Sequence, residues 1–223
     1  AFVGPSGIDA TLQPNLSGNK IFQITPTTGT TAPNVIGGTL TTAATMSFQW
    51  SASNTNPWDA RERKRFQTST AAGNATGMRT AYQAWYRSNT AGYGGFWFRA
   101  MYGQSINLNG AQAFIGLCNS SVALAGDPSA LLNMCGVGYD AGDASTGNWQ
   151  FMRNDGSGTA TKVDLGSDCA RGTSQGWELC MFMAPGGAEL FVQVTNLNAG
   201  VVALNTSYTT DIPAVNAGMC FKG

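Results

Sequence analysis

Short runs that resemble β-strands, rather than helical repeats, dominate the hydrophobic pattern of the chain. The run "ATMSFQWSA" alternates apolar and polar residues with a period of two, and "AQAFIGLCNS", "NWQFMRND" and "AELFVQVTNL" are dense in β-branched or aromatic residues. Segments rich in Gly, Asn, Asp and Pro, such as "GDPSA" and "NDGSGTA", separate these runs. Roughly ten or more short strands, with turns about every 8–12 residues, predict an all-β protein with an antiparallel β-sandwich or jelly roll.

The run "GGFWFRAMYG" has large residues on both faces of the expected strand, because successive side chains of a strand alternate between its faces. One face carries Phe96, Phe98, Ala100 and Tyr102, and the other carries Trp97, Arg99 and Met101. A ligand such as a sugar is one conceivable occupant of the second face. We expect instead that this face is buried, against the opposing sheet or against a neighbouring subunit, so that the strand is chiefly structural.

Two further patterns predict local structure. The segment from "WELCMFMA" to "GVVALNTS" predicts two consecutive hairpins, hence a meander, with "APGG" as a four-residue loop. The segment from Asp127 to Met134 permits either one helical turn, with Asp127 as cap and Pro128 as first residue, or a plain loop. No window of helical length has a clean spacing of three and four residues between its apolar positions.

The beginning of the chain differs from the rest. Residues 25–42, "TPTTGTTAPNVIGGTLTT", are rich in Thr, Gly and Pro and have no sustained period. We therefore predict an extended arm or neck over residues 1–40 and a β-sandwich domain over residues 41–223.

Composition and charge exclude several kinds of partner. Only 11% of the 223 residues are charged, the formal net charge is zero, and no apolar run approaches the ~20 residues that a membrane-spanning helix needs. We expect no nucleic-acid partner and no membrane insertion. The single charge run, "RERKRF" at residues 61–66, is typical of a polar strand face or a salt-bridged patch.

The residue inventory excludes most catalytic chemistry. His is absent, so no Ser-His-Asp triad, Cys-His pair or His-ligated metal site can form. The five Cys are widely spaced without a CxxC pair, which argues against a disulfide framework and a zinc site and favours folding in a reducing compartment. There is no phosphate-binding or dinucleotide-binding motif. We expect no cofactor, no metal and no enzymatic activity.

The acidic residues leave two alternatives to that expectation. A glycoside hydrolase would need two carboxyl groups about 5–9.5 Å apart, and the candidates are Asp140, Asp143, Asp155, Asp164, Glu178 and Glu189. The loops "YDAGDASTGN" and "NDGSGTATKVD" offer oxygen ligands for calcium but lack the full EF-hand pattern. Asx turns, in which Asp and Asn side chains bond their own backbone, are our preferred explanation of both loops.

The order of several segments resembles the distal domain of tailed-bacteriophage fibre and virion proteins. The segments are "RKRFQTSTAAGNATGMRTAYQAWYR", "GGFWFRAMYG", "AQAFIGLCNSS", "DPSALLNMCGVGYDAGD", "NWQFMRNDGSGTATKVDLG" and "YTTDIPA", and together they cover about residues 60–215. The resemblance consists of many weak matches in order rather than one diagnostic motif. The His-x-His tip of some fibres is absent from this sequence, as are a particle-attachment region and a long shaft.

The resemblance implies a concanavalin-A-like sandwich at the tip of a homotrimeric fibre. Such a protein would be made in the bacterial host cytoplasm and become part of the virion, with other virion proteins and a bacterial cell-surface glycan or protein as its partners. Alternatives are a virion structural subunit without a receptor, such as a head-decoration or tail-connector protein, and a capsule-degrading glycoside hydrolase.

We expect the receptor site on loops, which carry binding in sandwich proteins. Aromatic rings stack on the apolar faces of sugars, while Asn, Asp or Arg groups satisfy the hydroxyls. For any single Trp, however, the core or an interface is the simpler explanation. The candidate ligand-binding residues are Trp58, Arg61, Tyr93, Tyr139, Asp140, Asp143 and Trp149.

Overall fold

The computed structural model describes residues 22–26, 33–36, 38–43, 46–49, 58, 61–67, 75–104, 108–144, 146–172 and 174–223. The first part holds β1 (Gln23–Thr25), β2 (Asn34–Ile36), β3 (Leu40–Ala43), β4 (Met46–Gln49), β5 (Arg63–Phe66), β6 (Gly77–Thr80), β7 (Trp85–Tyr86) and β8 (Phe96–Gly103). The second part holds β9 (Ala113–Cys118), β10 (Met134–Tyr139), β11 (Gln150–Asn154), β12 (Thr161–Asp164), β13 (Gly176–Met183), β14 (Leu190–Asn196), β15 (Val201–Tyr208) and β16 (Gly218–Lys222). Two short 3-10 helices, η2 (Pro128–Ala130) and η3 (Ser167–Cys169), lie between these strands.

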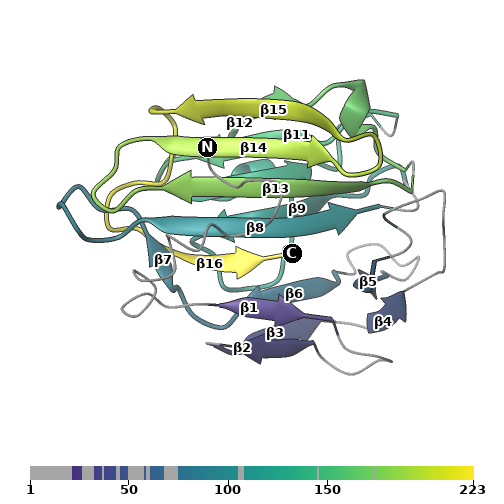
Figure 1. Cartoon of the computed structure of the whole chain (residues 1–223), viewed down its shortest axis with the longest axis horizontal. Helices are drawn as coiled ribbons and strands as arrows, with labels where there is room; N and C mark the ends of the chain where they lie inside the picture. Colours follow the sequence, from purple (N-terminus) through teal and green to yellow (C-terminus); the bar gives the residue numbers. More distant parts are fainter. Residues whose placement is uncertain are drawn as a thin grey trace.

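The strands form an antiparallel β-sandwich, as the hydrophobic pattern predicts (Figure 1). One sheet has the order β15-β14-β13-β8, and the other has the order β12-β11-β10-β9-β16-β6-β3 with β7 paired to β16. The predicted meander is confirmed, because β13, β14 and β15 are successive neighbours, although the loop between β13 and β14 spans residues 184–189 rather than four residues. Two further pairs, β1–β2 and β4–β5, complete the described strands.

The main core lies between the two sheets and follows the period of two. The inner residues of β13 are Trp177, Leu179, Met181 and Met183, all essentially inaccessible to solvent. Phe151, Val137 and Leu117 contribute to the same core from the eight-stranded sheet. Burial of such side chains is the principal favourable term in folding, at about 25 cal/mol per Å² of apolar surface.

Strand β8 has the alternation that its sequence predicts. Phe96, Phe98 and Tyr102 point into the core, whereas Trp97 and Met101 lie on the outer face, with Trp97 42% exposed. That outer face does not pack against the opposing sheet, so this part of the expectation was wrong. The alternative of a neighbouring subunit stays a prediction.

A second, smaller core covers the outer face of the eight-stranded sheet. Phe114, Cys118, Met134, Met152 and Cys220 are buried there. Residues 119–133 lie over part of this core, with Leu124 and Leu131 packed against it. The possible helical turn of this segment is a single 3-10 turn, η2, and the Asp127 side chain does not cap it.

Part of the predicted arm packs against the sandwich. Strands β1 and β2 lie within the range of residues 1–40 and pair with each other. Phe22 meets Trp85 edge to face, with ring centroids 5.6 Å apart, and Ile24 also packs on the main core. Residues 1–21, 27–32 and 37 of the predicted arm lie outside the described residues.

Replacing Leu179 with Ala should cost roughly 2–5 kcal/mol of the free energy of unfolding, because the main core would be left with a cavity. Val202→Ala is the matched control: Val202 lies on β15 and is 47% exposed, so its loss should change stability by less than about 0.5 kcal/mol. Urea denaturation followed by tryptophan fluorescence measures both. Equal losses in the two variants would contradict this assignment of the core.

Candidate functional site

A shallow depression of about 400 Å³ is open to solvent at one end of the sandwich. Its lining residues are Tyr86, Ser88, Thr90, Tyr93 and Asn216. They come from β7, from the loop that connects β7 to β8, and from the segment that precedes β16. Tyr86 is 39% exposed and Tyr93 is 63% exposed, whereas Ser88 is buried.

The loop between β7 and β8 is held by its own hydrogen bonds. The Tyr93 amide donates to the Thr90 carbonyl at 3.1 Å, and the Thr90 amide donates to Ser88 Oγ at 3.0 Å. The Gly95 amide donates to the Tyr86 carbonyl at 3.0 Å, which closes the base of the loop. Ser and Thr are suited to such turns because their hydroxyl groups bond to nearby backbone amides.

Gly95 fixes the point at which this loop enters β8. Its φ of 81° lies in the left-handed region, which glycine adopts without the steric cost that a side chain imposes. A Cβ at this position would lie 2.7 Å from the Met183 carbonyl oxygen and 2.7 Å from the Pro185 nitrogen. The loop therefore lies directly on the connection between β13 and β14.

Arg87 joins three segments behind the depression. Its guanidinium donates to the carbonyl groups of Gly187 and Pro213, at 3.4 and 3.3 Å. Its own carbonyl accepts the Asn216 amide at 2.7 Å, which places Asn216 beside the loop between β7 and β8. The walls of the depression are thus fixed by backbone contacts, while the two tyrosine rings stay in contact with solvent.

The lining combines two aromatic rings with two hydroxyl groups and an amide, and none of the five residues carries a charge. Aromatic rings offer flat apolar surfaces, and hydroxyl and amide groups both donate and accept hydrogen bonds. This combination suits a small neutral ligand that has both apolar faces and hydroxyl groups. Among the predicted site residues, Tyr93 lies here. The sequence analysis missed the other four, although "WYRSNTAGYGG" places hydroxyl residues between two tyrosines.

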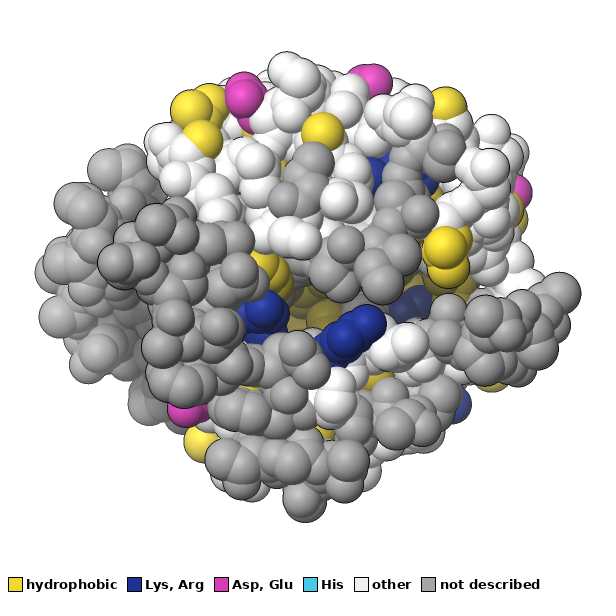
Figure 2. Space-filling model, turned by 90° about the vertical axis from the view of Figure 1, so that its right-hand side faces the viewer, with side chains coloured by type: hydrophobic (Ala, Val, Ile, Leu, Met, Phe, Trp, Pro, Cys, Tyr) yellow, Lys and Arg dark blue, Asp and Glu magenta, His cyan; other side chains and the backbone are white. Residues whose placement is uncertain are grey.

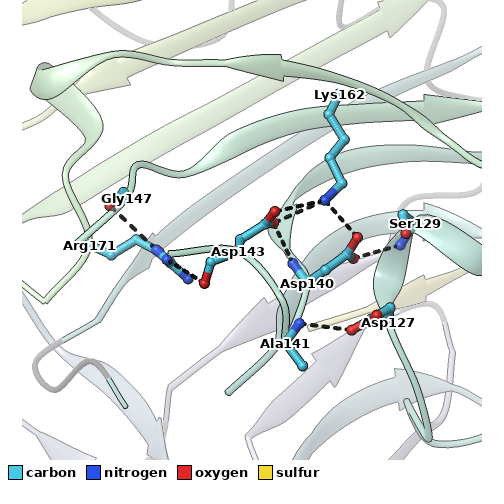
Figure 3. A network of polar contacts seen from close by, with 8 residues as sticks. All are labelled: Asp127, Ser129, Asp140, Ala141, Asp143, Gly147, Lys162 and Arg171. Carbon is cyan, nitrogen blue, oxygen red and sulfur yellow. Dashed lines mark hydrogen bonds and ion pairs between the residues drawn. The ribbon is translucent and has the colours of Figure 1, made fainter. Parts of the chain in front are cut away.

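Asp140 and Asp143 belong to a separate network in the loop that follows β10 (Figure 3). Lys162 Nζ lies between the two carboxylates, 2.6 Å from Asp140 Oδ2 and 3.0 Å from Asp143 Oδ2. Asp140 Oδ1 also accepts the Ser129 amide at 3.0 Å, and Asp143 Oδ2 accepts the Asp140 amide at 2.8 Å. The ammonium group thus occupies the position between the two acids that a bound cation would take.

The pKa values in this network shift in the directions that ion pairing favours. Burial alone would raise the pKa of Asp140, but hydrogen bonds from Lys162 and Ser129, together with the lysine charge, hold that pKa below its ordinary value. Burial would likewise lower the pKa of Lys162, but its bonds to Asp140 and Asp143 raise it. Asp140 and Lys162 therefore stabilise each other in their charged forms at neutral pH.

Further contacts surround this network. Asp127 Oδ1 accepts the Ala141 amide at 2.8 Å, and the Arg171 guanidinium lies 4.1 Å from the centre of the Tyr139 ring. The predicted Asx turn of the second acidic loop is confirmed, because Asp155 Oδ1 accepts the Ser157 amide at 2.8 Å. In the described part of the chain, no group of three or more Cys, Asp or Glu side chains has an arrangement that could hold a metal ion.

Tyr139 and Trp149 are core residues beside this network. Trp149 is 2% exposed and lies between Tyr102 and Tyr139, with ring centroids 4.9 and 5.1 Å away. The Tyr139 hydroxyl accepts a hydrogen bond from Gln104 Nε2 at 2.7 Å. Tyr93 precedes the first residue of β8, whereas Tyr102 lies near its last residue. Roughly 20 Å of extended strand therefore separates this cluster from the depression.

Trp58 and Arg61 lie at a third location, on the outer face of the four-stranded sheet. Trp58 is 8% exposed, and a Cβ on Gly176 would lie 2.2 Å from its ring, so the ring rests on glycine backbone. The Arg63 guanidinium lies 5.2 Å from the centre of the Trp58 ring, and exposed Arg61 donates to Met101 Sδ at 3.5 Å. Figure 2 shows basic side chains beside a hollow with hydrophobic walls at the end of the molecule where β4 and β5 lie.

The candidate residues therefore fall into three groups rather than one site. The other acids considered for catalysis also have partners: Glu178 accepts Arg99 Nε at 2.8 Å, Glu189 accepts the Ser207 hydroxyl, and Asp164 accepts Asn148 Nδ2 at 2.8 Å. In the described residues, no helix has the length and apolar character needed to cross a membrane. Comparison with known proteins finds no matching family model and no curated protein with significant sequence similarity.

Asp140→Asn should lower the free energy of unfolding at pH 7 by roughly 1–3 kcal/mol, because charged hydrogen bonds to Lys162 and Ser129 would be weakened. The depressed pKa makes the carboxylate stabilising above its unfolded pKa of about 3.9, and this contribution is lost as the pH falls through the folded pKa. The difference between variant and wild type should therefore shrink as the pH falls below about 4.

Urea denaturation at several pH values measures this difference. Glu62→Gln, which removes an exposed carboxyl group, serves as the control. It should change the free energy of unfolding by less than about 0.5 kcal/mol. A deficit of Asp140→Asn that stays constant from pH 7 to pH 2.5 would contradict an electrostatic role for Asp140.

Proposed function

We propose that the chain is a non-enzymatic receptor-binding domain of a bacteriophage tail fibre, which binds a bacterial surface glycan in the depression at Tyr86 and Tyr93. The observation that carries the binding proposal is the exposure of two tyrosine rings over a neutral, hydroxyl-lined hollow with fixed walls. The assignment to a phage fibre rests on the sequence resemblance over about residues 60–215.

The loops at this end suit recognition because the sandwich holds them rigidly. Preformed sites lose less conformational entropy on binding than flexible ones. The volume of the depression, about 400 Å³, falls at the lower end of the range for small-molecule sites, about 300–1,000 Å³. A single open site of this kind binds weakly, and a homotrimeric fibre tip raises the avidity by presenting three copies together.

A virion structural subunit is a second candidate, and one observation favours it. Trp97, Met101 and Val202 are exposed on the outer face of the four-stranded sheet. Tryptophan and methionine are enriched at the centres of protein–protein interfaces. This face serves equally as the contact between subunits of a fibre and as the contact with another virion protein.

Tyr93→Ala should weaken binding of the purified chain to cells of a susceptible strain, or to their isolated polysaccharide, by roughly 10-fold. The reason is the loss of one stacking surface, which is worth about 1 kcal/mol or slightly more. Tyr86→Ala should have a similar effect. Both rings are exposed, so the stability of the variants should be nearly unchanged.

Trp97→Ala is the control for the loss of an exposed aromatic ring, because Trp97 lies on the outer face of β8 and does not line the depression. Titration with fluorescently labelled protein over a panel of bacterial strains measures all three variants. Loss of binding in Trp97→Ala alone would move the receptor site to the outer sheet face. Binding to isolated virion parts, with none to any strain, would favour the structural subunit.

A further inference from the structure

Two cysteines that lie far apart in the sequence are direct neighbours in the eight-stranded sheet. Strand β16 pairs with β9 in antiparallel register, and Cys220 lies opposite Cys118. Directly opposed residues of antiparallel strands have Cα atoms about 4.5–5.5 Å apart, which is within the range of about 4.4–6.8 Å found for disulfides. Both side chains are buried in the small outer core, so they point to the same face.

The sulfur atoms converge on one backbone oxygen. Cys220 Sγ donates to the Ser120 carbonyl at 2.9 Å, and Cys118 Sγ donates to the same oxygen at 3.5 Å. Cys220 Sγ also lies 3.2 Å from the Cys118 carbonyl oxygen. Both thiols are free in this structure, and they lie under the segment that begins at Asn119.

A buried lysine lies beside the two thiols. Lys222 follows Cys220 by two residues on β16, so its side chain leaves the same face of the sheet. The residue is 5% exposed, and within the described part of the chain its Nζ is buried without a hydrogen-bond partner. An unpaired buried ammonium group is costly, and a neighbouring thiolate compensates part of that cost.

The pKa values are consistent with one thiolate and one thiol. The neighbouring Cys220 thiol, assisted by the charge of Lys222 and opposed by burial, lowers the pKa of Cys118 below its ordinary value. The hydrogen bond to Cys118 and burial raise the pKa of Cys220 well above its ordinary value. The thiolate is the reactive form in disulfide exchange.

We propose that Cys118 and Cys220 form a cross-strand disulfide that fastens β16 to β9, with a small disulfide such as oxidised glutathione as the oxidant. This proposal is independent of the receptor-binding function. It departs from the expectation of a protein without disulfides, because the link forms only after the chain meets an oxidising environment that supplies a disulfide reagent. Strand β16 lies between β9 and β6, so the bond would anchor the C-terminal strand inside the eight-stranded sheet.

The exchange proceeds in two balanced steps. The Cys118 thiolate attacks one sulfur of oxidised glutathione, the disulfide bond of glutathione breaks, and a glutathione thiolate leaves. Cys220 then loses its proton to this leaving thiolate and attacks the Cys118 sulfur of the mixed disulfide. The second glutathione leaves as a thiolate and takes a proton from solvent. Two protein thiols are oxidised, and one glutathione disulfide is reduced to two thiols.

The main test is refolding of the full 223-residue chain in a buffer of oxidised and reduced glutathione, which removes the barrier that burial presents to the reagent. Free thiols are then alkylated, and peptide mass mapping identifies any linked pair. We expect a single link between the peptides of Cys118 and Cys220, with three alkylated cysteines. Five alkylated cysteines, or a link between a different pair, would overturn the proposal.

Cys135→Ser is the matched control. Cys135 neighbours Leu117 across β9 and β10, but it belongs to the main core on the other face of the sheet, so the link should form normally in this variant. The link closes a long loop in the unfolded chain and should raise the melting temperature by the order of 10 °C over the reduced protein. An unchanged melting temperature in linked protein would contradict the role in anchoring β16.

Lys222→Met tests the contribution of the ammonium group. When the folded, reduced chain is exposed to oxidised glutathione at pH 7.5, the link should form several-fold more slowly in this variant, because less thiolate is present at Cys118. Met has nearly the same length and suits a buried position, so folding should not suffer. Equal rates in variant and wild type would remove Lys222 from the proposal and leave the pairing itself to the mapping experiment.

Discussion

Packing of β13 between β8 and β14 in one sheet, and against the eight-stranded sheet opposite, is the interaction on which the rest of the structure depends. Its four inner residues, Trp177, Leu179, Met181 and Met183, are buried along the whole length of the strand. The twist of the strands and the alternation of side chains between the two faces then determine which side chains of the neighbouring strands point into the core. A shift of register by one residue would expose these four side chains and bury Glu178, so the pairing has a single favourable alignment.

The same core positions the polar groups at both ends of the sandwich. At one end, Trp177 Nε1 and Asn196 Nδ2 both donate to the Asp168 carbonyl, at 2.9 and 2.7 Å, so that buried polar atoms find partners where the strands end. At the other end, the loop beside the depression lies directly on Met183, the last residue of β13, and on Pro185, two residues further along the chain. The strands and the hydrogen bonds within the loop between β7 and β8 together hold its conformation.

The sequence predicted the fold well because its signals are local. The alternation in β8, the meander of β13 to β15 and the Asx turn at Asp155 each depend on residues close together in the chain. The candidate site was harder to predict because it depends on distant residues. Nothing local relates Asn216 to Tyr93, which meet only because β16 pairs with β7, and nothing local relates Cys118 to Cys220.

The exposure of aromatic residues is likewise hard to predict from local sequence. Trp58, Tyr93 and Trp149 each follow a short segment that contains Asn and Thr, yet only Tyr93 is strongly exposed. Trp149 enters the core because β11 brings it between Tyr102 and Tyr139, and Trp58 is covered because glycines leave room for its ring. Exposure is decided by tertiary packing, which a turn-rich sequence context does not reveal.

The scarcity of charge determines what kind of recognition this surface permits. The acids near the core are already paired, as Asp140 and Asp143 are with Lys162, so their charges are compensated within the chain. The depression has only rings, hydroxyl groups and an amide. Selectivity in such a site comes from hydrogen-bond geometry, because a ligand that lacks one hydroxyl leaves a protein group desolvated and unpaired. Under the proposed function, such a neutral depression would discriminate between sugars by the position of their hydroxyl groups rather than by their charge.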